Sequence, residues 1–530
     1  MLYSGLTPVI NSATVISNYG PGPITGTRFV FLTNGGQQWL VYTSSSVTFT
    51  VSDNRLDLVA SGSFTGVIRT AYVPAGVSPD QLDSYANTYA TAGTVAPDLV
   101  AHGFQFQFQT DSAQLSPGST DQLLMLALPH HFKLGLSNAR AGMDIAWPTC
   151  ARGPMTGVLG KNWVLSVPRP AVDFDPAHSL DADKLDQVLS ALHKDVTSFR
   201  VDSPGVYFAG TQFSALARLV VIAENLGQTN DAACARAKLK DAILPWLTSS
   251  NPGDNFVYDT TFGGVVSSDG LLDQFNDYGN SVYNDHALQY GYYIHALAVI
   301  AKGDPGFTSD HFAAISSIVR DVVQISTSDP YFPQARNFDM FESHSWASGL
   351  YVFTDGNNIE SSSEALHTYY GAFLMGIATG DMMLKTWAGL LMQSEIIGTK
   401  QYKQMDQPRP VGDTVWTGQD VATYFGLNPE YVSCINWLPF TPITTSYLSA
   451  DFMRQAWPLA SIGLASNSVE DGWMAYLYMA QSLYDKATAF ASAIDFITAG
   501  HAKPAGTFLT GQYSRVTATD VLYFVGTQAN

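Results

Sequence analysis

The sequence predicts a multidomain β + α protein: an N-terminal antiparallel β-sandwich, a small linking α/β segment, and a C-terminal domain of helix pairs. An (α/α) barrel is the leading candidate for that last domain. Two observations support this prediction. The apolar pattern has a period of two near the N-terminus and takes the helical period from about residue 196. In addition, 46% of the 530 residues are hydrophobic, so two or three domains can each bury a core.

Residues 1–135 have the composition of strands. Segments rich in β-branched and aromatic residues, separated by Gly, Asn and Asp, are 28–32, 39–42, 47–51 and 102–109. In the last segment, Phe104, Phe106 and Phe108 alternate with glutamines, so the rings and the amides should lie on opposite faces of a sheet. One apolar and one wet face is typical of an antiparallel sandwich. The glutamine face could bind sugar, but a solvated face is the simpler interpretation.

The rest of the chain divides into three parts. Residues 136–195 mix Pro, Gly and short apolar runs, which is typical of a linking segment or small domain. Residues 196–500 should form the helical domain, and its expected helices lie near 232–247, 285–302, 310–325, 363–378, 381–397, 455–465 and 472–498. Residues 501–530 look strand-like again, at 507–510 and 520–525, so we expect this tail to pack on an earlier sheet.

Charge and composition restrict the partners. Only 13% of the residues are charged and the formal net charge is −19, which opposes binding to the phosphates of nucleic acid. A neutral, hydroxyl-rich ligand such as a carbohydrate suits a surface of aromatic and uncharged polar groups, although composition alone does not establish it. The N-terminus has no signal-peptide pattern and we find no apolar stretch of 18 residues, so no membrane partner is expected.

Polar side chains are concentrated in two stretches, residues 276–293 and 337–365. Glu360 and Glu364 are one turn apart if a helix begins near Ser361, so both carboxyls would lie at its N-terminal end. Asp285 stands at a similar expected helix start. Each of these three could serve catalysis or simply cap a helix, and taken singly the sequence leaves both interpretations open.

Aromatic and histidine side chains accompany these carboxyls. His344 and Trp346 fit a sugar subsite, in which an indole face stacks on a pyranose, although Trp346 could equally belong to the core. His286 taken alone is more typical of a hydrogen-bonded structural histidine. No Walker, GxGxxG, HExxH or CxxC pattern occurs in the chain, so neither a cofactor nor a metal is expected.

Together these stretches resemble glycoside hydrolase family 81, the endo-β-1,3-glucanases. The matching segments are Tyr283-Asn-Asp-His286, Tyr290-Gly-Tyr292, Glu342-Ser-His-Ser-Trp-Ala-Ser-Gly-Leu350, Asp355-Gly-Asn-Asn-Ile-Glu-Ser-Ser-Ser-Glu-Ala365 and Tyr369-Tyr-Gly371. Supporting similarity is found at Leu128-Pro-His-His131, Gly153-Pro-Met-Thr-Gly157, Tyr207-Phe-Ala-Gly210, Ala217-Arg-Leu219, Asn436-Trp-Leu-Pro439 and Thr441-Pro442.

The resemblance implies an N-terminal β-sandwich, a small linking domain and an (α/α)6 barrel that carries the cleft. It also implies hydrolysis of internal β-1,3-glucosidic bonds with inversion, with Asp285 as general acid, Glu360 as general base and Glu364 positioning the base and the water. The substrate-binding residues that it suggests are Tyr283, His286, Gln289, Tyr292, His344, Trp346 and Tyr369. The implied partner is β-1,3-glucan, and we expect a monomer acting outside the cell, although no signal is visible.

The chain departs from the family pattern in three places. Where the family commonly has Asp-His-His-Phe-His, this chain has Asp285-His-Ala-Leu-Gln289, so two expected histidines are missing. Gln289 forms hydrogen bonds but carries no charge. Ser343 replaces a glycine and Thr211 replaces a lysine. The lost histidine motivates an alternative, a glucan-binding protein without turnover. A third possibility is a helical-barrel hydrolase or lyase acting on a different polysaccharide.

Overall fold

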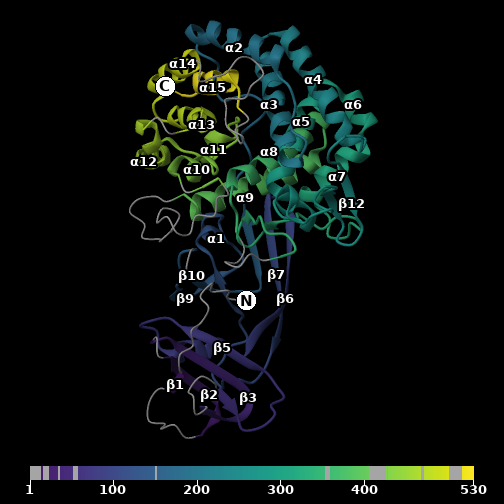
Figure 1. The fold of residues 1–530 in the computed structure, drawn as a ribbon. Coiled ribbons are helices and arrows are strands. Elements are labelled where there is room, and N and C mark those ends of the chain that lie inside the picture. The colour runs from purple at the N-terminus through teal and green to yellow at the C-terminus, as the bar shows by residue number, and fades with distance from the viewer. Residues whose placement is uncertain are drawn as a thin grey trace. The chain divides into compact units, whose positions relative to one another are not determined.

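The protein is described here as a computed structural model. The described residues are 13–15, 23–33, 36–51, 58–149, 152–351, 358–404, 425–426, 428–466, 469, 471–499 and 516–529. They form two compact units, Met1–Val167 and Pro168–Asn530. Residues 136–195, expected to form a linking segment, are therefore divided between the two units. The first unit is rich in strands and the second is mainly helical (Figure 1).

The first unit contains three antiparallel sheets. The first sheet consists of β1 (Ala13–Val15), β2 (Ile24–Thr33), β3 (Gln38–Val51), β4 (Leu58–Ala60) and β5 (Ile68–Val73). The second consists of β6 (Thr88–Asp98), β7 (Gly103–Ser112) and β11 (Asn162–Ser166). The third consists of β8 (Leu124–Ala127), β9 (Arg140–Trp147) and β10 (Met155–Leu159), and the short helix α1 (Pro129–Lys133) follows β8.

The predicted alternation of aromatic rings and amides is confirmed in β7. Phe104 and Phe106 are buried, whereas Gln107 and Gln109 are exposed to solvent. Phe106 lies opposite Trp163 of β11 in the ladder, so aromatic side chains fill the inner face of this sheet. The other face is the solvated one.

The second unit is mainly helical. Its helices are α2 (Leu185–Ser198), α3 (Val206–Asn225), α4 (Thr229–Leu247), α5 (His286–Gly303), α6 (Pro305–Asp310), α7 (Phe312–Val323), α8 (Ser362–Thr379), α9 (Met382–Tyr402), α10 (Pro429–Cys434), α11 (Thr444–Tyr447), α12 (Ala450–Ala460), α13 (Asp471–Gln481), α14 (Lys486–Thr498) and α15 (Ala518–Gly526). Two short hairpins are β12 (Phe256–Asp259) with β13 (Gly264–Ser267), and β14 (Phe338–Asp339) with β15 (His344–Ser345).

The three central helices α3, α5 and α8 are buried on nearly every side. A helix that is apolar all round must be surrounded by other elements, and α5 packs between α3 and α8 while α8 also packs on α9 (Figure 1). Small residues permit the close approach of α5 and α8. A Cβ atom on Gly291 would collide with Thr368, so glycine is required at this crossing.

The C-terminal segment corrects one prediction. Residues 518–526 form helix α15, which packs on α2, α3, α13 and α14 rather than pairing with a sheet. Thr517 and Asp520 form a reciprocal capping box at its start. A short apolar run reads equally as a buried strand or a buried helix, and the capping pair was the signal that separates the two. The other strand-like segment, 507–510, lies outside the described residues.

Helix α3 is both long and largely apolar. By length and composition it could cross a membrane, and it is the one such helix within the described part of the chain. Its side chains are almost all buried inside the helical unit. The central helix of a folded domain has the same composition, so this helix gives no support for a membrane partner.

Candidate active site

The three carboxyl groups singled out in the sequence line one pocket of the helical unit. The starts of α3, α5 and α8 meet there, together with the loop before α5. The lining residues are Tyr207, Tyr278, Asp285, Leu288, Gln289, Glu360, Glu364 and Phe425. The separate polar stretches of the sequence are therefore brought together by the packing of α5 against α8.

Asp285 immediately precedes helix α5. Its backbone is left-handed, with φ 59° and ψ 13°, and its side chain forms no capping hydrogen bond. The backbone N–H of Asp285 donates to the carbonyl oxygen of Ala347 at 2.9 Å. A non-glycine residue in this conformation is strained, and such strain is concentrated at functional sites. The capping interpretation therefore does not account for this side chain.

The environment of Asp285 favours its protonated form. The residue is only 9% exposed. Burial raises the pKa of Asp285 well above its ordinary value, and the negative charges of Glu360 and Glu364 raise it further. Among the described residues that line the pocket there is no lysine, arginine or histidine to oppose this effect. The site thus favours the protonated form of this carboxylic acid over the ion.

Helix α8 begins where the sequence predicted. Ser361 is its N-cap, and the Ser361 hydroxyl accepts from the backbone N–H of Glu364 at 3.3 Å. Glu360 is the residue before this cap and is partly exposed. Because Ser361 supplies the side-chain cap, helix capping does not require the Glu360 carboxyl.

Glu364 is held rigidly by two tyrosines. Its Oε1 atom accepts from the hydroxyl of Tyr207 at 2.8 Å and from that of Tyr292 at 2.5 Å. Burial raises the pKa of Glu364 to about 7, although the hydrogen bonds from the tyrosines oppose that rise. The carboxyl is therefore fixed in position and titrates near neutral pH.

Two predicted substrate-binding residues lie inside the protein instead. His286 is fully buried, with Nδ1 2.6 Å from Asp321 and Nε2 2.8 Å from the Asn280 carbonyl oxygen. Tyr283 is buried as well, and its hydroxyl donates to Asp259 at 2.8 Å. Both side chains have their polar atoms bonded within the fold, and neither lines the pocket.

Three further predicted residues have structural contacts. Tyr292 is buried and contacts two lining residues, Glu364 by a hydrogen bond and Tyr207 by its ring edge. Tyr369 is fully buried, with its hydroxyl 2.6 Å from that of Ser345. His344 is also buried, and its Nδ1 lies 2.8 Å from the Ser345 carbonyl oxygen. The structure does not bring Tyr369 and His344 to the pocket, because their helix and loop turn them into the core.

Gln289 and Trp346 remain as candidates for contact with a ligand. Gln289 lines the pocket, with its amide bonded to the Asp277 carbonyl oxygen at 3.0 Å and to Asn280 at 2.8 Å. Trp346 is partly exposed and packs edge-on against His344, with ring centroids 4.4 Å apart. It is not among the residues that line this pocket.

Sequence reasoning missed four lining residues: Tyr207, Tyr278, Leu288 and Phe425. Tyr207 belongs to a segment quoted for its similarity to family 81, so that segment was the available signal. Tyr278 has φ 59° in a run of left-handed residues before α5, and no pattern in the sequence predicts which way its ring points.

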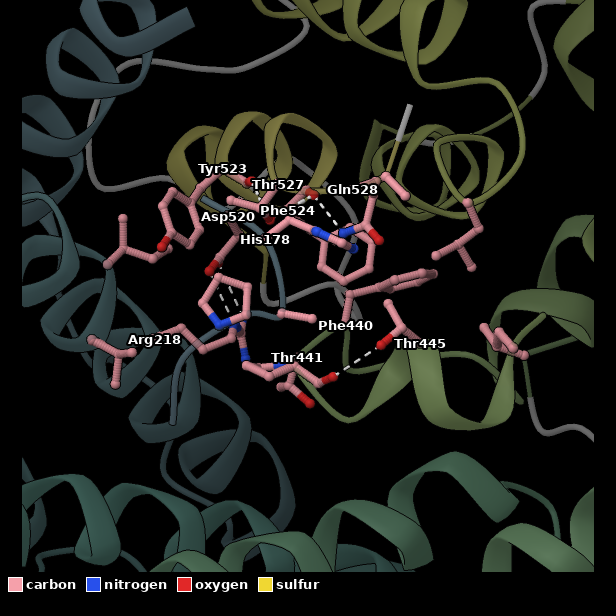
Figure 2. A pocket seen from close by; sticks show the side chains of 18 of the residues that line it. His178, Arg218, Phe440, Thr441, Thr445, Asp520, Tyr523, Phe524, Thr527 and Gln528 are labelled. Carbon is pink, nitrogen blue, oxygen red and sulfur yellow. Dashed lines mark hydrogen bonds and ion pairs between the residues drawn. The ribbon is translucent and has the colours of Figure 1, made fainter. Parts of the chain in front are cut away.

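A second, larger cavity of about 250 Å³ lies elsewhere in the helical unit. Figure 2 shows its aromatic walls, among them Phe440, Tyr523 and Phe524, around the pair Arg218 and Asp520. This pair is bidentate, with N···O distances of 2.9 and 3.1 Å. Arg218 neutralises Asp520, the one carboxyl among the described residues that line this cavity. The larger volume of the cavity therefore does not make it the better catalytic site.

Comparisons with known proteins place the chain in a family. The glycosyl hydrolase family 81 N-terminal domain matches residues 1–179, and the family's C-terminal domain matches residues 179–501. A glucan endo-1,3-beta-D-glucosidase of Glycine max is 32% identical over 497 residues, which cover 88% of this chain and 72% of that protein. A primary septum glucan endo-1,3-beta-D-glucosidase of Schizosaccharomyces pombe is 28% identical, covering 94% of this chain and 51% of that protein. This chain therefore spans only about half of the second relative.

A solved structure has a similar fold. It is a family 81 glycoside hydrolase from Clostridium thermocellum, with a TM-score of 0.73 and 20% identity, covering 97% of this chain and 70% of that one. The strand-rich N-terminal region and the helical C-terminal domain agree with that relationship. By its two domain matches and its similarity to the Glycine max protein, the chain belongs to glycosyl hydrolase family 81.

Proposed function

We propose that the protein is an endo-acting β-1,3-glucanase that hydrolyses internal bonds of laminarin-like polymers with inversion of anomeric configuration. The observation that carries the proposal is the meeting of Asp285, Glu360 and Glu364 in one pocket, where their environments differ. Pairs of carboxyls with separated pKa values are the basis of glycosidase acid and base chemistry. The names of the relatives from Glycine max and Schizosaccharomyces pombe support the choice of substrate.

Asp285 serves as the general acid. The leaving sugar oxygen must be protonated as the glycosidic bond breaks, and a buried acid beside two other carboxyls retains the required proton. After the step, the Asp285 carboxylate is restored to its acidic form by a proton from solvent.

Glu360 serves as the general base. It is more exposed than Asp285 and Glu364, so its ionised form is better solvated. It takes a proton from a water molecule whose oxygen attacks the anomeric carbon from the face opposite to the leaving group. Glu364, fixed by Tyr207 and Tyr292, positions the base and this water. For inversion the acid and base carboxyls should stand roughly 6.5–9.5 Å apart.

The pocket surface suits a neutral polymer. Tyr207, Tyr278 and Phe425 offer aromatic faces for stacking on pyranose rings, and Gln289 offers an uncharged amide. Trp346 is a candidate for a more distant subsite. We place the enzyme outside the cell, because its substrate is an extracellular polymer. We also expect it to act as a monomer.

The architecture belongs to the same proposal. We infer an N-terminal β-sandwich and an (α/α)6 barrel whose inner helices are α3, α5, α8, α10, α13 and α15. Contacts of α3 with α5, of α5 with α8, of α10 with α13, of α13 with α15 and of α15 with α3 support such a ring. The catalytic pocket would then lie at the end of the barrel where α3, α5 and α8 begin.

Incubation with laminarin, and separately with cellulose, followed by measurement of new reducing ends, tests the proposal. We expect release from laminarin, with products of inverted configuration in proton NMR spectra recorded early in the reaction. No release by the folded protein would overturn it. Affinity for laminarin without hydrolysis, unaffected by Glu360→Gln, would instead indicate the glucan-binding protein.

A further inference from the structure

One peptide group connects the segments that carry the acid and the base. The carbonyl oxygen of Ala347 accepts from the backbone N–H of Asp285 at 2.9 Å, and the N–H of Ala347 donates to the Asn358 carbonyl oxygen at 2.8 Å. Asn358 lies two residues before Glu360. The position of Ala347 therefore influences both the backbone of the acid and the approach to the base.

The loop that contains Ala347 is anchored by a buried carboxyl group outside the pocket. Glu395 of α9 accepts from the backbone N–H of Ser345 at 2.8 Å and from its hydroxyl at 2.9 Å, both through Oε2. Tyr369 of α8 lies 2.6 Å from the same hydroxyl. Glu395, Ser345 and Tyr369 are all fully buried, so this contact ties the loop to two helices without competition from water.

The packing around this contact leaves little room for movement. Gly398, one turn after Glu395 on α9, lies so close to the loop that an added Cβ atom would collide with the Ser343 carbonyl oxygen. Ser343 itself is left-handed, with φ 58°. Helix α9 thus fixes the residues on either side of His344, and through them the residues up to Ala347.

Burial of the Glu395 carboxyl lowers the stability of the fold. Oε1 of Glu395 makes no hydrogen bond within the described part of the chain, and a buried polar atom without a partner destabilises the fold. Burial raises the pKa of Glu395 to about 8, against the opposing hydrogen bonds from Ser345 and the charge of Lys403. Burial therefore favours the neutral acid over the ion, and in either form Oε2 accepts from Ser345.

We propose that Glu395 is a positioning residue for the reaction: by holding Ser345 it sets the position of Ala347, and thereby the separation of Asp285 and Glu360. This inference rests on the proposed function, because it is the separation of acid and base that it explains. Inverting hydrolysis depends on that separation, since one water molecule must fit between the base and the sugar.

The test compares Glu395 with a matched contact whose residues do not line the pocket. Oδ2 of Asp195 on α2 accepts the backbone N–H and the hydroxyl of Thr519 at 2.8 and 2.6 Å, the same arrangement as Glu395 with Ser345. Glu395→Ala, Glu395→Gln and Asp195→Ala are assayed on laminarin well below their melting temperatures. Hydrogen exchange is measured in the same proteins for peptides covering Asp285 and Ala347.

We expect Glu395→Ala to lower kcat about 100-fold with KM nearly unchanged, as for a misplacement of about 1 Å. Glu395→Gln, whose amide oxygen still accepts from Ser345, should keep kcat within about threefold, and so should Asp195→Ala. Exchange at the Asp285 and Ala347 amides should rise in Glu395→Ala alone. If Glu395→Ala does not fold, Glu395→Asp, which shortens the side chain by one methylene, should show the same loss of kcat and the same rise in exchange.

Two results would overturn the proposal. One is a loss of kcat in Glu395→Ala no greater than in Asp195→Ala, and the other is unchanged exchange at Asp285 and Ala347. Equal losses in Glu395→Gln and Glu395→Ala would also contradict it, because the acceptor would then not be the property that matters. If the wild-type protein releases nothing from laminarin, the proposed function fails, whereas the exchange data still test the anchor.

Discussion

The charges that neighbour the acids of the helical unit differ in sign between two places. In the catalytic pocket, Asp285 faces Glu360 and Glu364, and carboxyl stands beside carboxyl. In the larger cavity, Asp520 is held by the guanidinium of Arg218. Asp285, Glu364 and Asp520 are all buried, so the neighbouring charge decides the chemistry. Neighbouring carboxyls favour the protonated form of an acid, whereas pairing with arginine makes an acid part of the fold.

The largest effect should come from the acid and the base of the catalytic pocket. We expect Asp285→Asn and Glu360→Gln each to lower kcat on laminarin by about 10³-fold or more, because each removes a proton-transfer group. The melting temperature should change little, since neither side chain caps a helix. Reducing-end assays and thermal melts measure the two quantities, and nearly full activity in either variant would remove that residue from its assigned role.

The paired acid should behave in the opposite way. Arg218→Met leaves Asp520 buried without its cation, and we expect a loss of about 3–5 kcal/mol in the free energy of unfolding. Among the molecules that remain folded, kcat should stay within about twofold of the wild type. Urea titration and an assay corrected for the folded fraction test this. A large fall in kcat without loss of stability would contradict a purely structural role of the Arg218–Asp520 pair.

The pH dependence of stability should also reveal the buried acids whose pKa is raised, Glu364 and Glu395. Burial raises the pKa of Glu364 from 4.5 to about 7 and that of Glu395 from 4.5 to about 8, so in these ranges the folded state binds more protons than the unfolded state. The free energy of unfolding must then fall as pH rises, by up to about 1.4 kcal/mol per pH unit for each group.

Urea titrations at pH 5 and pH 8 measure this decline. We expect lower stability at pH 8, and a smaller difference between the two pH values in Glu395→Gln, which cannot ionise. Stability that increased from pH 5 to pH 8 would mean that the paired acids dominate instead.

The smallest effect should come from the tyrosines that hold Glu364. Their hydrogen bonds lower the pKa of Glu364 against the effect of burial, so Tyr292→Phe should raise that pKa further and move the corresponding limb of the pH–rate profile to higher pH. A shift of about one unit corresponds to about 1.4 kcal/mol. An unchanged profile would show that Glu364 does not titrate in the rate-limiting step. Tyr290→Phe is a suitable control, because the Tyr290 hydroxyl bonds to the Val265 carbonyl oxygen and to Asn280 rather than to Glu364.

Much of the site was predictable because local chemistry marks it. The run Ser361 to Glu364 carries its own N-cap signal, so the start of α8 and the positions of Glu360 and Glu364 followed from the sequence. The change of period near residue 196 separated the strand-rich region from the helical one. The alternation in β7 correctly assigned Phe106 to the core and Gln107 to solvent.

The tertiary structure decided which way the side chains of the central helices point. Helices α5 and α8 are apolar on every side, so no stripe in the sequence distinguishes the face toward the pocket from the face toward the core. His286 and Tyr369, which the family resemblance suggested as sugar ligands, are buried, whereas Tyr207, which lines the pocket, was overlooked. The contact of Glu395 with Ser345 joins residues far apart in the chain, and only the packing of α9 against the β15 loop brings them together.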